Sequence, residues 1–166
     1  YENALELLDE GNEWYLDSEG GYVYYWPRNG VNIGGNSKAT LPLFDAYGKP
    51  MIKISGSAGA SVQNLTFDNL TFADVTWTRP STVKGHSDAQ NNHLRDIGDA
   101  LADGVIDVYY AKNVNFTNNA FTRLGTTALR FLDGTKNSNI IGNEFYDLSS
   151  GAINVGSPNT GAAYRN

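Results

Sequence analysis

Two segments of this chain, 113–124 and 137–148, match position by position at an offset of 24 residues. A third, 64–75, fits the same pattern and begins 49 residues before the first, about two periods earlier. A unit of this size cannot bury its own apolar face, but units stacked in register share one core. The repeat therefore predicts an all-β fold of stacked coils over 50–155, a β-solenoid with parallel pairing. The competing interpretation is an antiparallel sandwich.

Turn-forming residues are abundant, with 18 Gly and 19 Asn among 166 residues. Both residue types favour turns, which argues against a helical bundle and for many short strands joined by corners. Asn119 and Asn143 occupy equivalent repeat positions. We expect their amide side chains to hydrogen-bond from coil to coil as a ladder.

The chain is expected to have two parts. Residues 1–42 hold a short helix over 1–11, an aromatic β-hairpin and a loop, all packing on the solenoid. Residues 43–166 hold the coils, with an irregular insertion at about 78–103. The residues expected in the core are Leu65, Phe67, Phe72, Phe116, Phe121, Leu129, Phe131, Ile140, Phe145, Ile153 and Val155.

Charge and composition exclude several functions. The net charge of −6 disfavours nucleic acid and anionic membranes as partners. The chain has no Cys and only two His, which excludes thiolate chemistry and a triad of histidines around a metal. No apolar run is long enough to span a bilayer. We expect neither a metal nor an organic cofactor.

Several motifs carry a resemblance to a known group. They are Asn-Glu-Trp-Tyr-Leu-Asp at 12–17, Val-Tyr-Tyr-Trp-Pro at 23–27, Val-Gln-Asn-Leu-Thr-Phe at 62–67, Trp-Thr-Arg-Pro-Ser at 77–81, Gln90, and Gly-Ala-Ile-Asn-Val-Gly at 151–156. In these motifs the chain resembles the right-handed parallel β-helix proteins of carbohydrate metabolism, in particular the group around glycoside hydrolase family 141. That resemblance implies a secreted protein acting on plant cell-wall glycans, and such proteins normally continue for several more coils. We therefore expect further coils or self-association beyond the C-terminal edge.

A polar stripe is the main candidate site. Strand alternation sends Asp107, Arg130 and Asn154 outward from three successive coils, one above another. Glycoside hydrolysis needs two carboxyl groups. Asp107 is the first candidate for a catalytic carboxyl, and Asp133 and Asp103 are the next two. The competing interpretation is a solvated charge ladder in which Asp107 and Arg130 form an ordinary surface ion pair.

Three further residues are candidates for binding sugar. His86 and Gln90 lie in the insertion, where loops on a rigid scaffold often carry function. Trp77 could stack on a sugar face, although at a strand end it is more often part of the core. For His86 the competing interpretation is an exposed loop residue without a role.

Three functions remain open at this point. The first is a secreted glycoside hydrolase that uses carboxylate acid–base chemistry on an oligo- or polysaccharide. The second is a non-catalytic β-helix module that binds glycan or belongs to a larger secreted assembly. The third is a polysaccharide lyase, which needs a base and usually a cation to neutralise a uronate. It ranks last because Arg130 is the one basic residue predicted on the stripe.

Overall fold

The computed structural model divides the chain into two compact units, residues 1–40 and 41–166. Each unit is described by itself. The residues that the structure describes are 4–17, 19–34, 44–46, 48–77, 93–94 and 100–156.

The first unit contains the predicted hairpin. β1 (Trp14–Asp17) pairs antiparallel with β2 (Tyr22–Tyr25), and the Asp17 carboxylate accepts hydrogen bonds from the Glu19 and Gly20 amides in the turn. The short helix expected over 1–11 is present only as a 3-10 helix of 3 residues, η1 (Leu5–Leu7), so the predicted extent is too long. A segment this short forms too few hydrogen bonds to offset the cost of nucleating an α-helix.

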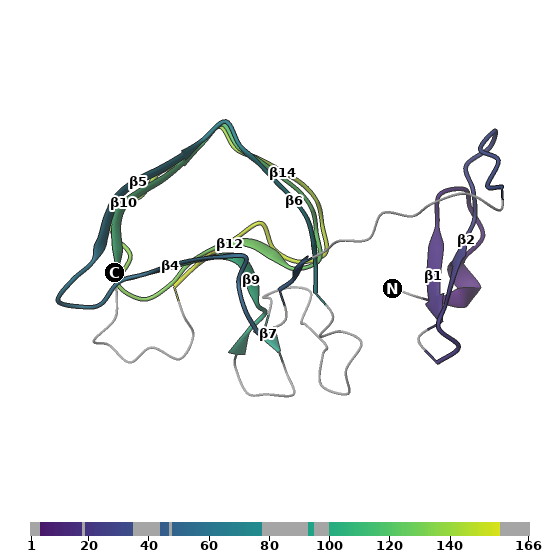
Figure 1. The fold of residues 1–166 in the computed structure, drawn as a ribbon, viewed down its shortest axis with the longest axis horizontal. Helices are drawn as coiled ribbons and strands as arrows, with labels where there is room; N and C mark the ends of the chain where they lie inside the picture. The colour runs from purple at the N-terminus through teal and green to yellow at the C-terminus, as the bar shows by residue number, and fades with distance from the viewer. Residues whose placement is uncertain are drawn as a thin grey trace. The chain divides into compact units, whose positions relative to one another are not determined.

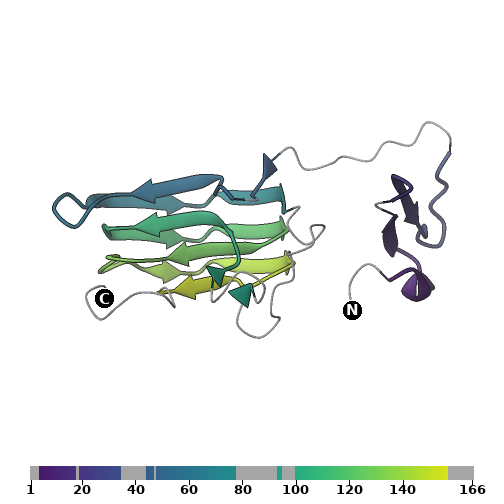
Figure 2. The same ribbon diagram turned by 90° about the horizontal axis from the view of Figure 1, so that it is seen from below.

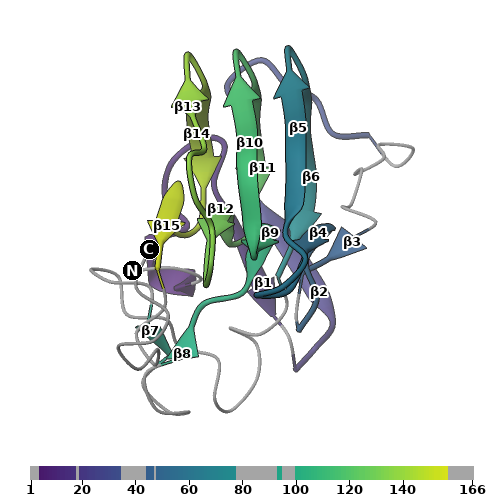
Figure 3. The same cartoon turned by 90° about the vertical axis from the view of Figure 1, so that its left-hand side faces the viewer.

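In the second unit the chain passes repeatedly through the same three parallel sheets, and each passage adds strands to them. One sheet has the order β15-β12-β9-β4, a second β13-β10-β5 and a third β14-β11-β6-β3. Figure 1 looks along this stack, so that strands of one sheet overlap, and Figures 2 and 3 show the successive layers. The strands are β3 (Phe44–Asp45), β4 (Ile52–Ser55), β5 (Val62–Asp68), β6 (Thr71–Thr76), β9 (Gly104–Tyr109), β10 (Ala111–Thr117), β11 (Ala120–Leu124), β12 (Thr127–Phe131), β13 (Ile140–Ile141), β14 (Glu144–Leu148) and β15 (Ile153–Val155).

The register follows the sequence repeat. Phe121 pairs with Phe145, 24 residues later, and with Phe72, 49 residues earlier, and both pairings are parallel. The predicted all-β stack of parallel strands is confirmed, and the antiparallel sandwich is excluded for these strands. Within the predicted insertion, β7 (His93–Leu94) pairs antiparallel with β8 (Ala100–Leu101).

Aromatic side chains form the centre of the core. The Phe121 ring lies between those of Phe72 and Phe145, with centroids 4.9 and 4.7 Å away. Phe116 stacks on Phe67 in the same way. Side chains that alternate inward at one repeat position thus form continuous columns through the stack.

The predicted core is correct only in part. Phe72, Phe116, Phe121, Leu129 and Phe131 are buried, and Phe67, Ile140 and Phe145 are half-buried. Leu65, Ile153 and Val155 are exposed, Val155 to 74%. These three lie on β5 and β15, the outermost described strands of their sheets. A side chain there has a neighbouring strand on one side only, so the repeat pattern overestimates its burial.

Asparagines form the corners between the sheets. Asn69 lies between β5 and β6, and Asn118 lies between β10 and β11, with φ of 54° and 53°, a left-handed conformation that Asn tolerates better than most residues. The predicted ladder is confirmed, since Asn119 Nδ2 donates to Asn143 Oδ1 at 2.9 Å. Asn119 Oδ1 also accepts from the Leu70 amide, which joins three layers.

Candidate functional site

A row of four polar residues crosses the sheet formed by β4, β9, β12 and β15. Arg130 pairs in register with Asp107 on one side and Asn154 on the other, as the sequence predicts. Lys53 pairs with Asp107 and extends the row by one strand. Sequence reasoning missed Lys53, although its apolar neighbours Ile52 and Ile54 mark it as outward-facing. Arg130 is therefore not the one basic residue of the row.

Asp107 and Arg130 form a buried, bidentate ion pair. Arg130 Nε donates to Asp107 Oδ1 at 2.6 Å, and Nη2 donates to Oδ2 at 2.5 Å. The two residues are 3% and 9% exposed. The expectation that both are exposed is wrong. Their alignment one coil apart is correct, but their environment is that of a core ion pair.

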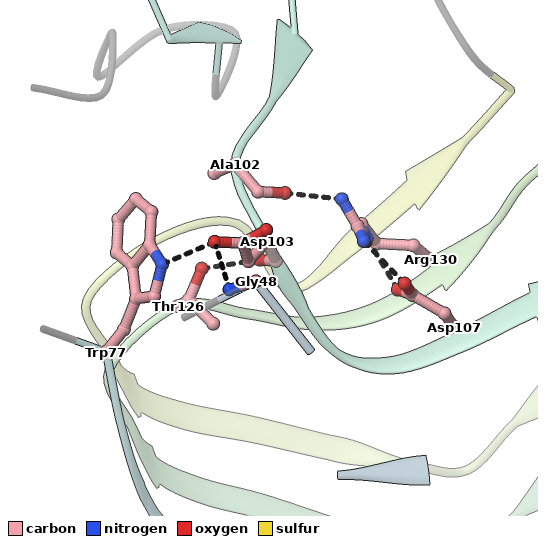
Figure 4. Close-up of polar contacts among 7 residues, drawn as sticks. All are labelled: Gly48, Trp77, Ala102, Asp103, Asp107, Thr126 and Arg130. Carbon is pink, nitrogen blue, oxygen red and sulfur yellow. Dashed lines mark hydrogen bonds and ion pairs between the residues drawn. The ribbon is translucent and has the colours of Figure 1, made fainter. Parts of the chain in front are cut away.

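The chain entering β9 accounts for this burial. The Ala102 carbonyl accepts from Arg130 Nη1 at 2.6 Å, so the backbone of this segment lies against the guanidinium (Figure 4). A Cβ at Gly104 would lie 2.5 Å from both Arg130 Nε and Asp107 Oδ1. Only a residue without a side chain lets the backbone approach the pair so closely. Strand alternation alone does not reveal such a covering segment.

Asp103 and Trp77 contact each other beside this pair. The Trp77 indole Nε1 donates to Asp103 Oδ2 at 2.8 Å, and the Gly48 amide donates to the same oxygen at 3.2 Å (Figure 4). The Asp103 carbonyl accepts from Thr126 Oγ1. Trp77 is buried, so its ring does not offer an open face for a sugar. Asp103 is half-buried, and both of these contacts of its carboxylate involve the same oxygen.

Tyr109 is a site residue that sequence reasoning missed. It follows Asp107 by two positions and pairs with Ser55 of β4, so it belongs to the same face. The Lys53 ammonium lies 5.7 Å from the centroid of its ring. Burial, followed by the charge of Asp107, raises the pKa of Tyr109, while Arg130 lowers it. Asp133 and Asp103 also raise it. An aromatic residue two positions after a polar one was the available signal.

The remaining candidates lie in different situations. Asp133 is half-buried, and among the described residues nothing hydrogen-bonds or ion-pairs with its carboxylate. Asn154 is half-buried at the end of the row. His86 and Gln90 fall outside the described residues.

The described residues contain neither a cluster of metal-binding side chains nor a membrane-spanning helix. Within the described part of the chain, no three acidic or histidine side chains gather as they would around a metal ion. In that same part, no helix has the length and apolarity to cross a membrane.

The comparisons with known proteins give one structural match to report. No family model and no curated protein matches the chain. A solved structure described as a glycoside hydrolase is similar to it, with a TM-score of 0.69 and 26% sequence identity. The similarity covers 98% of this chain and 30% of that protein, so this chain spans less than a third of its length.

Proposed function

We propose that this chain is part of a secreted, right-handed parallel β-helix protein of the glycoside hydrolase type, acting on plant cell-wall glycans. The observation that carries the proposal is the similarity of nearly the whole chain to a solved protein described as a glycoside hydrolase. The parallel three-sheet stack supports it, because rigid coils can hold side chains such as Lys53, Tyr109 and Asn154 in a row along an extended polymer.

The glycan is proposed to bind along the outer face of β4, β9, β12 and β15. Lys53, Tyr109 and Asn154 offer a cation, a phenol and an amide there. Hydroxyl-rich ligands are recognised by a few polar groups of this kind beside an apolar surface.

Asp133 is the proposed catalytic carboxyl on this face. Asp103 is not its partner, because it lies beside Thr126 at the start of the paired strands β9 and β12, whereas Asp133 lies beyond their end, next to Tyr110. The Asp107 carboxylate is the poorer candidate, because both of its oxygens already accept from Arg130. Among the described residues, nothing hydrogen-bonds or ion-pairs with the Asp133 carboxylate, and the contacts of Asp103 involve only one of its two carboxylate oxygens. Two carboxyl groups suffice for hydrolysis, one to protonate the leaving oxygen and one to act as base or nucleophile.

A non-catalytic glycan-binding module is the second candidate. The observation that favours it is the commitment of Asp107 to a buried ion pair, which is a structural role. Both candidates place glycan on the same face, so they differ only in turnover.

One experiment separates these candidates. The protein and its Asp133→Asn and Asp103→Asn variants are assayed for binding and hydrolysis of xylan fragments and aryl fucosides. Asp74→Asn, an exposed carboxylate on another sheet, is the control. Loss of turnover by orders of magnitude with binding retained in the Asp133 variant supports the hydrolase. Binding without turnover in the unmodified protein supports the module, and absence of both contradicts the proposal.

A further inference from the structure

The Lys53 ammonium is held over an aromatic ring beside the candidate site. Lys53 is exposed, and its Nζ lies 5.7 Å from the Tyr109 ring centroid. A cation at this distance is attracted to the negative face of the ring. This contact restricts the flexible side chain, so the ammonium has a defined position on the outer face.

The charge on Lys53 is not neutralised by its neighbour in the row. Asp107 pairs with Lys53 in register, but each Asp107 oxygen already accepts from the Arg130 guanidinium. Among the described residues, Lys53 takes part in no ion pair. In the described part of the chain, Lys53 thus presents an ammonium that no carboxylate contacts, although the chain as a whole carries a net charge of −6.

Two hydroxyl groups accompany this cation. Ser55 pairs with Tyr109 in register and is exposed, so both belong to the face that carries Lys53. Burial and the Asp107 charge raise the pKa of Tyr109, which keeps its phenol protonated and able to donate. An ammonium and two hydroxyl donors together match a group that only accepts hydrogen bonds and carries negative charge.

We propose that Lys53, Ser55 and Tyr109 form a subsite for the carboxylate of a uronic acid residue in the bound glycan. This inference rests on the proposed function and adds the class of sugar to it. A single ammonium matches a single carboxylate, so the ligand is a neutral glycan with an isolated uronate, rather than a continuous polyuronate.

A matched pair of ligands tests this subsite. Titration calorimetry compares xylotetraose with xylotetraose that carries one glucuronic acid side group. The unmodified protein is expected to bind the acidic ligand about tenfold more tightly at low salt, the effect of roughly one charge-assisted contact. This preference should shrink as ionic strength rises, because screening weakens exposed charges.

Variants identify the residues responsible. Lys53→Gln should abolish the preference for the acidic ligand, and Tyr109→Phe should reduce it. Lys112→Gln, an exposed lysine on β10 in a different sheet, is the control and should keep it. Equal affinity of the unmodified protein for both ligands overturns the uronate subsite but leaves glycan binding intact. A preference for the acidic ligand that survives Lys53→Gln also overturns the uronate subsite and leaves glycan binding intact. Failure of both ligands to bind overturns the proposed function itself, and the subsite with it.

Discussion

Arg130 of β12 holds Asp107 of β9 through two parallel hydrogen bonds, Nε to Oδ1 at 2.6 Å and Nη2 to Oδ2 at 2.5 Å. The two residues lie directly opposite each other in adjacent strands. A third donor, Nη1, reaches the Ala102 carbonyl. The guanidinium thus connects β12 both to β9 and to the segment that precedes β9. These contacts are shielded from water.

Asp107→Asn should destabilise the fold strongly. The substitution leaves the Arg130 charge buried without its counter-charge, and breaking such a pair typically costs about 3–5 kcal/mol. A urea titration measures the free energy of unfolding directly. The same substitution would leave the melting temperature almost unchanged if Asp107 were exposed, as the sequence alone suggests.

Asp74→Asn is the matched control for that measurement. Asp74 also accepts two hydrogen bonds from an arginine, Arg123, but both side chains are more than half exposed. Solvent screens that pair, so its loss should change stability little. Equal effects of the two substitutions would contradict the buried character of the Asp107–Arg130 pair.

Gly104→Ala should disturb the same pair from the backbone side. The added methyl group would lie 2.5 Å from Arg130 Nε and Asp107 Oδ1, well inside contact distance. We expect a loss of roughly 1–3 kcal/mol in thermal or urea unfolding, as overpacking of a tight site typically causes. Gly59→Ala, where a Cβ meets nothing within 4 Å, serves as the control. A neutral Gly104→Ala substitution would mean that the segment does not pack against the pair.

Much of the fold could be predicted from the repeat. The match of Phe121 with Phe145 and of Asn119 with Asn143 specifies parallel pairing at one coil spacing, because only stacked units bring equivalent residues together. The same match could not predict that Leu65 and Val155 are exposed. Burial depends on whether a further strand lies alongside, and the pattern within one unit does not contain that information.

The candidate site was only partly predictable. Alternation correctly aligned Asp107, Arg130 and Asn154, since the side-chain period of a strand is two. It could not reveal that the chain before β9 covers two of them. That contact joins residues from outside the repeat, and its signal in the sequence is a single glycine, Gly104. The contact between the Lys53 ammonium and the Tyr109 ring joins two strands that are far apart in the sequence, so the sequence pattern does not show it.

Phe121→Ala should create a large cavity in the core. Its ring is fully buried between two stacked phenylalanines, and such truncations cost about 3–5 kcal/mol. The free energy of unfolding from a urea titration provides the measurement. Val155→Ala, at an exposed edge position, should stay within about 0.5 kcal/mol. A loss below about 1 kcal/mol for Phe121→Ala would contradict the stacked register.

Asn119→Ala should break the corner ladder. The side chain accepts from the Leu70 amide and donates to the Phe67 carbonyl and to Asn143. Removing it leaves partly buried backbone groups without partners, at about 1–3 kcal/mol for each buried group. Hydrogen exchange of the Leu70 amide should accelerate along with the fall in stability. Unchanged exchange at Leu70 would show that water replaces the side chain.

Tyr109 should make stability fall at alkaline pH. Its pKa is raised in the folded state, so the folded protein holds the phenolic proton more tightly than the unfolded chain. The resulting stabilisation is fully present below the ordinary tyrosine pKa of about 10 and is lost as pH rises from there through the folded value. Difference absorbance spectra of the unmodified protein against Tyr109→Phe isolate this titration. A midpoint at or below the ordinary value would contradict the half-buried position of Tyr109 beside Asp107.

The most direct test of the proposed glycan-binding face is a map of where carbohydrate binds. Backbone amide signals of the isotopically labelled protein are followed by NMR while a xylan-derived oligosaccharide is added. If glycan binds on the proposed face, we expect the shifts to cluster on β4, β9 and β12, at Lys53 to Ser55, Asp107 to Tyr109 and Arg130 to Asp133. Shifts confined to other strands or to the β1–β2 hairpin, or no shifts at saturating ligand, would contradict this glycan-binding face.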